Sequence, residues 1–267
     1  MPQFSGDEGK VELDIDSAVV GGAKAEERTS ADKVVADFSH VRFAWDDSHE
    51  FGLDINDFQI MPGEKILLIG PSGSGKSTFL SLLTGINRAQ SGRVSILDQD
   101  LGDFSNEGRD RFRAEHFGII FQMFNLLPYG SVIDNVILPL SFAKRRADRA
   151  DKSDGFESEA RRLMTRLGLE EDIQNRNSTS ALSVGQQQRV AAARALIGQP
   201  DIIVADEPTS SLDRNRQSIF LDLLFEEVEA ARSTLVMVSH DEGLGANFDR
   251  VIDLHDIVKT GARGGAS

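Results

Sequence analysis

The chain has 267 residues, of which 40% are hydrophobic and 27% are charged, which is typical of a globular protein of one or two domains. Its formal net charge of -14 argues against a broad affinity for DNA or anionic lipid, so no nucleic-acid partner is expected. Cysteine is absent, no stretch approaches the roughly 18 apolar residues of a membrane span, and no secretory segment follows Met1, so we expect a soluble intracellular protein.

The two ends of the chain have compositions that predict little structure. Residues 1–33 are acidic, small and polar, and they are expected to form a flexible N-terminal segment because they have little apolar surface to bury. Residues 259–267 are rich in glycine and alanine and are expected to form a flexible tail. The folded part is therefore predicted to span residues 34–258.

Between these ends, β-like runs are interspersed with segments of helical spacing. Strands are expected at residues 34–43, 51–60, 66–69, 93–97, 118–122, 202–205, 234–239 and 250–254. Helices are expected at residues 76–83, 108–115, 134–147, 157–167, 184–197 and 214–231. The run at 202–205 is apolar on both faces, which is typical of a central parallel strand. A helical subdomain of about residues 123–181 is predicted to be inserted into this α/β core.

The most informative segment joins the strand predicted at 66–69 to the helix predicted at 76–83. This phosphate loop reads Gly70, Pro71, Ser72, Gly73, Ser74, Gly75, Lys76 and Ser77, followed by Thr78. Glycines allow the backbone N–H groups to face phosphate oxygens, and the new helix presents its positive end. Lys76 can reach the β- and γ-phosphates, while the Ser77 hydroxyl can bind Mg²⁺. An accidental Gly/Ser-rich turn is the alternative, with a chance probability on the order of one in a hundred.

Two further predicted strands end in residues suited to phosphate chemistry. Asp206 ends one strand, where it can hold Mg²⁺ or its waters, and Glu207 is placed to polarise the water that attacks the γ-phosphate. Two solvated acids are the alternative, which the presence of Lys76 disfavours. His240 follows another strand and can donate to γ-phosphate oxygens, although a lone histidine is more often structural.

A second helix start, at residues 182–186, has the features of an anion site. We name this stretch, Leu-Ser-Val-Gly-Gln, the signature segment. Ser183 has the position of an N-cap, Gly185 allows close backbone approach, and the following helix offers N–H groups. One nucleotide has only one phosphate tail, so this helix is expected to face the nucleotide of another subunit. Taken alone, the pattern is a common helix cap.

The order of these motifs resembles the nucleotide-binding domain of ABC transporter ATPases. The shared motifs are the phosphate loop, Gln122, the signature segment, Asp-Glu-Pro at 206–208, Ser-Ser-Leu-Asp at 210–213 and His240. The resemblance covers roughly residues 34–256, and residues 113–128 and 135–140 resemble the lipoprotein-releasing and macrolide-exporter branch. It implies an α/β fold with a P-loop NTPase core, made of a mixed sheet with flanking helices, an inserted helical subdomain and a small antiparallel β subdomain.

The resemblance also implies roles for residues outside these strand ends. Trp45 corresponds to the aromatic residue that stacks on adenine, with Phe43 as the alternate, and either could instead belong to the core. Gln122 corresponds to the glutamine that touches Mg²⁺ and the attacking water and relays the nucleotide state to the helical subdomain. Asp213 would reach across a dimer, and Pro208 would shape the turn after Glu207.

The implied assembly is a head-to-tail homodimer around two Mg-ATP molecules. Each would lie between residues 70–78 of one subunit and Ser183, Gly185 and Gln186 of the other, with Glu207 and His240 carrying hydrolysis. Val184 departs from the family pattern, which has glycine there. Because a β-branched residue resists positive φ and adds bulk, we expect hydrolysis that is retained but slowed.

A membrane permease is the partner that the resemblance implies. The segment at 122–129, from Gln122 to Tyr129, is the expected docking surface, with core packing of its apolar residues as the alternative. This would place the chain on the cytoplasmic face of the inner or plasma membrane, in export, lipid or lipoprotein extraction, or envelope remodelling. Two other readings stay open: a soluble ABC ATPase acting on DNA or ribosomes, and a non-transporting regulator of a membrane protein.

Overall fold

The computed structural model describes residues 34–45 and 52–260. The flexible segment predicted at residues 1–33 lies outside the described residues, as do residues 261–267 of the predicted tail. Residues 259 and 260, at the start of that predicted tail, pair with another strand. None of the helices in the described part of the chain is both long and apolar enough to cross a membrane.

One sheet is antiparallel, with the strand order β10-β2-β1-β4-β5. Its strands are β1 (Ala36–Ala44), β2 (Gly52–Ile60), β4 (Ser91–Ile96), β5 (Gln99–Asp100) and β10 (Lys259–Thr260). Residues of β1 alternate between buried and accessible positions, because successive side chains of a strand point to opposite faces, except at Ser39 and His40, where the register with β4 shifts. The buried face includes Phe38, whose ring stacks on Phe79 of α1 (Lys76–Leu83) at 5.0 Å between ring centroids.

The other sheet is parallel, with the strand order β6-β7-β8-β3-β9. Its strands are β3 (Lys65–Ile69), β6 (Phe117–Ile120), β7 (Ile202–Asp206), β8 (Thr234–Val238) and β9 (Arg250–Asp253). Side chains of β7 alternate between two cores: Ile202 and Val204 pack with the antiparallel sheet and α1, whereas Ile203 and Ala205 pack with the helices on the opposite face. The fold class predicted from the sequence is confirmed, with the antiparallel and parallel strands in separate sheets.

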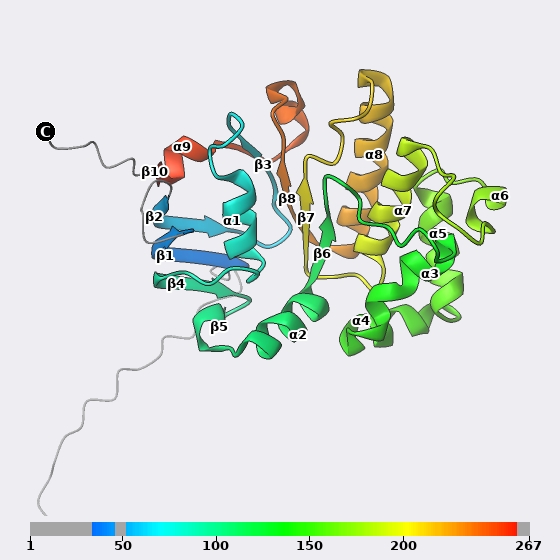
Figure 1. The fold of residues 1–267 in the computed structure, drawn as a ribbon, viewed down its shortest axis with the longest axis horizontal. Helices are drawn as coiled ribbons and strands as arrows, with labels where there is room; N and C mark the ends of the chain where they lie inside the picture. Colours follow the sequence, from blue (N-terminus) through cyan, green and yellow to red (C-terminus); the bar gives the residue numbers. More distant parts are fainter. Residues whose placement is uncertain (1–33, 46–51, 261–267) are drawn as a thin grey trace, which may run out of the picture. The chain divides into compact units, whose positions relative to one another are not determined.

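Helices cover the parallel sheet and extend from it (Figure 1). Besides α1 they are α2 (Asn106–His116), α3 (Val132–Ile137), α4 (Lys144–Ala150), α5 (Phe156–Arg166), α6 (Glu171–Gln174), α7 (Val184–Leu196), α8 (Arg214–Ala231) and α9 (Leu254–Ile257). Short 3-10 turns are η1 (Leu101–Asp103), η2 (Leu138–Ser141), η3 (Asp151–Ser153) and η4 (Glu242–Asn247). In Figure 1, α3, α4, α5 and α6 gather beside α7, on the side away from the antiparallel sheet.

The single helix predicted at residues 134–147 is wrong. The chain forms α3, then the 3-10 turn η2, then α4, and Pro139 lies in the turn between the two helices. Proline has no N–H to donate and its ring clashes with the preceding helical turn, so the helix cannot continue through it. The new helix α4 begins where the Glu115 carboxylate accepts the backbone N–H groups of Lys144 and Arg145, at 2.9 and 2.8 Å.

A buried arginine ties α4 to the end of α7. Arg146 is 2% exposed, and its guanidinium donates to the carbonyl oxygens of Phe117, Ala195 and Ile197 at 2.7 to 3.0 Å. The last carbonyls of a helix lack partners within the helix, so the guanidinium satisfies groups that would otherwise be buried without hydrogen bonds. Burial lowers the pKa of Arg146 to about 10, which leaves it protonated at neutral pH.

Replacing Arg146 with methionine should lower the free energy of unfolding by about 3 kcal/mol or more, because several buried carbonyls lose their donor. Urea denaturation followed by circular dichroism measures this change. Arg145→Met is the matched control: the Arg145 side chain is half exposed and pairs with Asp201, so its loss should cost less than about 1 kcal/mol. Equal denaturation midpoints for the two variants would contradict the role of Arg146.

Candidate active site

The phosphate loop has the backbone conformation that its glycines predict. It joins β3 to α1, and Gly75 forms the N-cap of α1 with φ of 103°. Gly70 has φ of 151°, and a Cβ there would lie 2.9 Å from the Ser74 hydroxyl oxygen. Both glycines lie in the positive-φ region that other residues rarely adopt, so the tight curl of the loop depends on them.

Lys76 is folded over the loop that precedes it. Its ammonium group donates to the carbonyl oxygens of Gly70 at 2.6 Å and Pro71 at 3.0 Å. An ammonium group has three donors, so this arrangement leaves one for an anion. The Ser74 hydroxyl of the same loop is buried without a hydrogen-bond partner in the structure.

A cavity of about 410 Å³ brings together residues that are far apart in the sequence. Its lining consists of Ser72, Gly73, Gly75, Lys76, Ser77, Thr78, Gln122, Asp206 and Glu207. All nine were predicted from the sequence as site residues, and they come from the loop after β3, the start of α1, the segment that follows β6 and the end of β7. The cavity therefore lies at the carboxyl edge of the parallel sheet, where ligands of α/β folds bind.

The oxygen atoms of Ser77 and Asp206 form a donor set that suits Mg²⁺. The Ser77 hydroxyl donates to the Asp206 carboxylate at 3.1 Å. Burial raises the pKa of Asp206, and the Ser77 hydrogen bond and the charge of Lys76 act in the opposite direction. Among the described residues no group of three or more His, Asp or Glu side chains could form an all-protein metal site. Mg²⁺ is usually held by one or two protein groups together with waters and substrate phosphates.

Glu207 combines backbone strain with contact to a histidine. Its φ is 45°, and its N–H donates to the Val238 carbonyl oxygen at 3.0 Å. A residue other than glycine in this region is strained, and such strain clusters at active sites. The Glu207 carboxylate lies 3.1 Å from Nδ1 of His240, which is the more exposed of the two side chains. The structure therefore brings both predicted hydrolytic residues together at the end of β7 and β8.

The signature segment starts α7 but does not reach this cavity within one chain. Ser183 and Gln186 form a reciprocal capping box, in which the Ser183 hydroxyl accepts the Gln186 N–H and the Gln186 side chain accepts the Ser183 N–H at 2.9 Å. Among the described residues that line the cavity, none belongs to positions 183–186. Asp213 is likewise outside it: this side chain caps α8 by accepting the Arg216 N–H at 3.0 Å.

The conformation expected at Val184 is wrong. Val184 is the first residue of α7, so its backbone is helical and needs no positive φ. Its side chain is 48% exposed, and a Cβ on the neighbouring Gly185 would meet only Leu212, at 3.9 Å. The valine therefore adds apolar bulk on the open side of the helix start without straining the backbone.

Trp45 lies beside the phosphate loop, whereas Phe43 is buried. The indole ring is 61% exposed, and its Nε1 donates to the Thr78 hydroxyl oxygen at 3.2 Å. Phe43 packs edge-on against it at 5.3 Å between ring centroids and belongs to the core. Of the two aromatic residues considered from the sequence, Trp45 is the one whose face is accessible to a base.

Only some residues of the docking surface predicted at 122–129 are exposed. Phe124 is buried in the core, and Leu126 packs against that core. Met123 and Tyr129 are each 80% exposed. The prediction is therefore wrong for Phe124, whereas Leu126 is partly buried. The chain turns here, with positive φ at Phe124 and Asn125.

Sequence reasoning missed Arg194, which holds the segment after Gln122. Its guanidinium donates to the Asn125 carbonyl oxygen at 2.8 Å and also to that of Phe124. The only signal in the sequence was a charged residue within the apolar stretch 190–197 of a predicted helix. Such a residue indicates a buried cation, but its partners lie about 70 positions earlier and could not be read from the pattern.

Comparison with known proteins agrees with this geometry. Residues 53–210 match the ABC transporter family model. The chain is 42% identical over 192 residues to an uncharacterized ABC transporter ATP-binding protein, YbbA of Escherichia coli K12, covering 72% of this chain and 81% of that protein. It is 38% identical over 200 residues to the lipoprotein-releasing system ATP-binding protein LolD of Syntrophotalea carbinolica, covering 75% and 85% of the two chains.

A solved structure shares the fold. It is the dimeric post-hydrolysis state of the ATP-binding cassette MJ0796 bound to ADP and Pi, with a TM-score of 0.70 and 31% identity over 86% of this chain and 100% of that one. Lipoprotein-releasing and macrolide-export ATP-binding proteins both occur among the relatives, as the sequence motifs predicted. The chain therefore belongs to the ABC transporter family, as an ATP-binding protein that hydrolyses ATP.

Proposed function

We propose that this chain is the ATP-hydrolysing subunit of a membrane transporter, and that it works as a homodimer that closes around two Mg-ATP molecules. The observation that carries the proposal is the separation, within one chain, of the phosphate-loop cavity from the capped and accessible start of α7. A second subunit placed head to tail would bring its signature segment to the open side of the cavity. The dimeric MJ0796 cassette supports this arrangement.

Each residue of the cavity has a task in this proposal. Lys76 binds the β- and γ-phosphates with the donor that the loop carbonyls leave, and the loop N–H groups bind the remaining oxygens. Mg²⁺, held by Ser77 and Asp206 with Gln122 nearby, would neutralise phosphate charge when bound. Glu207 orients the attacking water and accepts its proton, while His240 holds the Glu207 carboxylate and donates to the γ-phosphate oxygens.

The γ-phosphate is what joins the two subunits in this scheme. It would contact Lys76 of one subunit and the Ser183 hydroxyl and α7 N–H groups of the other. A ligand shifts a conformational equilibrium only by its differential affinity for the two states, and the bridging phosphate supplies that difference. Loss of the phosphate by hydrolysis would then allow the dimer to open.

A permease is proposed to dock beside Gln122, at a groove of about 510 Å³ next to the predicted surface. Its apolar lining includes Ile119, Phe121 and Phe142, and Arg111 and Arg113 of α2 lie along it. Phe142 is exposed, and Phe121 directly precedes Gln122, so an occupant of the groove would contact the segment that reaches the nucleotide. This docking would place the chain at the cytoplasmic face of the inner or plasma membrane.

Export, extraction of lipids or lipoproteins, or envelope remodelling is the role that we propose for the assembly. LolD, whose name describes a lipoprotein-releasing system, and MacB, whose name describes macrolide export, are among the relatives and support it. The net charge of -14 and the transporter names of the relatives favour this role over action on DNA or ribosomes.

Replacing Glu207 with glutamine should leave ATP binding intact and trap the chain as an ATP-bound dimer, because the water loses its base while the phosphate contacts remain. Size-exclusion chromatography with light scattering should show a dimer with Mg-ATP and a monomer with Mg-ADP, and turnover should fall at least about a hundredfold. Lys76→Ala is the matched control and should stay monomeric with either nucleotide. Wild-type turnover in the glutamine variant would show that Glu207 is not the catalytic base.

Replacing Val184 with glycine should preserve ATP hydrolysis and raise kcat by roughly two- to tenfold, because it removes apolar bulk facing the partner's phosphates without a change of backbone conformation. Steady-state phosphate release measures this effect. Val184→Ile keeps the helical conformation and enlarges the side chain, so it should slow turnover. Loss of activity in the glycine variant would mean that the valine contributes to the closed site.

Replacing both Tyr129 and Phe142 with alanine should reduce recovery of the copurifying membrane protein by tenfold or more, since burial of each large apolar side chain is worth roughly 1.5–3 kcal/mol. Affinity purification from detergent-solubilised membranes, quantified by mass spectrometry, measures the loss. Mg-ATP affinity should not change. Phe156→Ala, at an exposed aromatic on α5, is the control. Undiminished recovery would place the docking surface elsewhere.

A further inference from the structure

Near Trp45, the backbone of β1 forms hydrogen bonds with a side chain where a neighbouring strand would otherwise pair with it. Main-chain pairing between β1 and β4 ends at Arg42 and Ser91, and the Gln90 N–H donates to the Arg42 carbonyl oxygen at 2.8 Å. Ala44, two residues further along β1, has no β4 residue opposite it. The Gln90 amide takes that place: its Oε1 accepts the Ala44 N–H at 3.0 Å and its Nε2 donates to the Ala44 carbonyl oxygen at 3.2 Å.

This pair of hydrogen bonds, which we call the clamp, reproduces the backbone hydrogen bonds that a neighbouring strand would make. In an antiparallel pair, two opposed residues exchange both of their backbone hydrogen bonds. A glutamine side chain carries one acceptor and an NH₂ donor on the same planar group, so it can make the same exchange with one residue. Both backbone groups of Ala44 are thereby fixed from one side, although Gln90 itself is exposed.

Ala44 directly precedes Trp45. It lies opposite Gly52 of β2 on one side and is held by the Gln90 amide on the other, so both sides constrain where the indole ring can lie. Among the described residues, the ring is also held by its edge contact with Phe43 and by the hydrogen bond from Nε1 to Thr78. Thr78 lines the phosphate cavity, and Lys76, two residues before it, carries the ammonium group of the same cavity. The Gln90 amide therefore lies at one end of a short chain of contacts whose other end is the nucleotide site.

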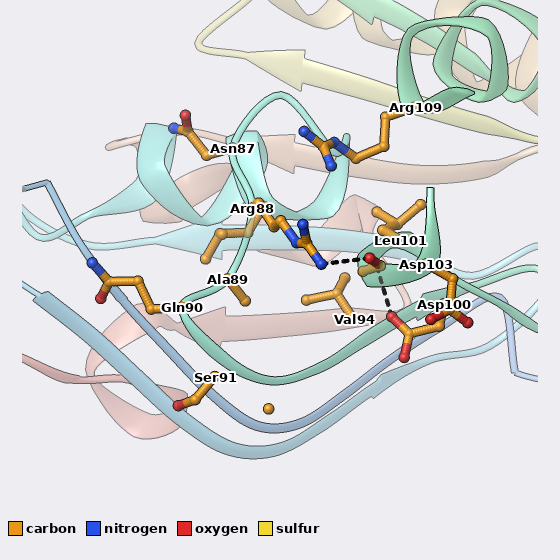
Figure 2. A pocket seen from close by; sticks show the side chains of 13 residues that line it. Asn87, Arg88, Ala89, Gln90, Ser91, Val94, Asp100, Leu101, Asp103 and Arg109 are labelled. Carbon is orange, nitrogen blue, oxygen red and sulfur yellow. Dashed lines mark hydrogen bonds between the residues drawn. The ribbon is translucent and has the colours of Figure 1, made fainter. Parts of the chain in front are cut away.

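Gln90 is not part of the polar network around it. It lies at the rim of a cavity of about 320 Å³ beside Arg88 and Arg109, and in Figure 2 its side chain points away from both guanidinium groups. The Arg88 guanidinium donates instead to the Gly102 carbonyl oxygen, at 2.7 Å (Figure 2). The hydrogen bonds of the Gln90 amide are thus made to Ala44.

We propose that Gln90 is a positioning residue for the nucleotide base. By fixing Ala44 it holds the Trp45 ring in place to stack on adenine, and without it the ring would sample more orientations. This inference rests on the proposed stacking role of Trp45. The phosphate contacts belong to the loop and α1, so loss of the clamp should affect binding of the base and not of the phosphates.

The test replaces Gln90 with leucine, which keeps the size of the side chain and removes both hydrogen bonds. We expect KM for ATP to rise about two- to fivefold with kcat unchanged. Inorganic tripolyphosphate with Mg²⁺, used as a competitive inhibitor, should keep its wild-type inhibition constant because it has no base. Gln90→Glu retains the acceptor for the Ala44 N–H and should give an intermediate KM. The chain has one tryptophan, so its fluorescence reports directly on Trp45.

Gln59→Leu is the matched control, since it is the same substitution on β2, in the sheet that Gln90 adjoins, and should leave KM for ATP unchanged. A wild-type KM in Gln90→Leu would overturn the proposal, as would equal weakening of ATP and tripolyphosphate, which indicates a general structural effect. Trp45→Ala distinguishes failure of the role proposed for Gln90 from failure of the stacking role proposed for Trp45. If it raises KM and Gln90→Leu does not, only the role of Gln90 fails; if it leaves KM unchanged, the proposed stacking itself is wrong.

Discussion

Parallel pairing of β6, β7, β8 and β3 forces the carboxyl ends of these strands onto one edge of the sheet. The phosphate loop follows β3, Glu207 follows β7, and His240 lies two residues beyond β8, so side chains that are distant in the sequence come within hydrogen-bonding reach. The contact between Ser77 and Asp206 and the contact between Glu207 and His240, each at 3.1 Å, are direct results. The chemistry of the site depends on strand direction before it depends on any single residue.

Helix α7 is the element that relates the site at this edge to the second subunit and the membrane partner of the proposed function. The signature segment starts a helix outside the cavity of its own chain, so in the proposed dimer its N–H groups would face the nucleotide of the other chain. Arg194, near the other end of that helix, holds the carbonyl oxygens just after Gln122. One helix, α7, thus connects the surface proposed to face a partner's nucleotide with the segment beside the docking groove. This helix gives a physical route between nucleotide binding and permease docking.

The predictions from sequence succeeded where a local signal was used, and they failed where a local signal was overlooked or where a distant contact decided the structure. The bounds of α1 and α8 were predicted correctly, because glycine at the first helix start and Asp213 as an N-cap act within one turn. The helix predicted at 134–147 was wrong through neglect of Pro139, which is a local signal. Burial of Phe124 could not be read from the sequence, since its surroundings come from helices later in the chain.

The sequence by itself determined which chemistry the chain can perform, because the phosphate loop, Asp206 and Glu207 are short patterns whose roles follow from residue type and spacing. Tertiary structure alone decided which side chains meet: that Gln90 clamps Ala44, that Arg146 satisfies the end of α7, and that the signature segment lies outside its own chain's cavity. The physical reason is that residue type fixes the donors and acceptors a side chain carries, whereas packing of distant elements fixes which of them come within about 3 Å of one another.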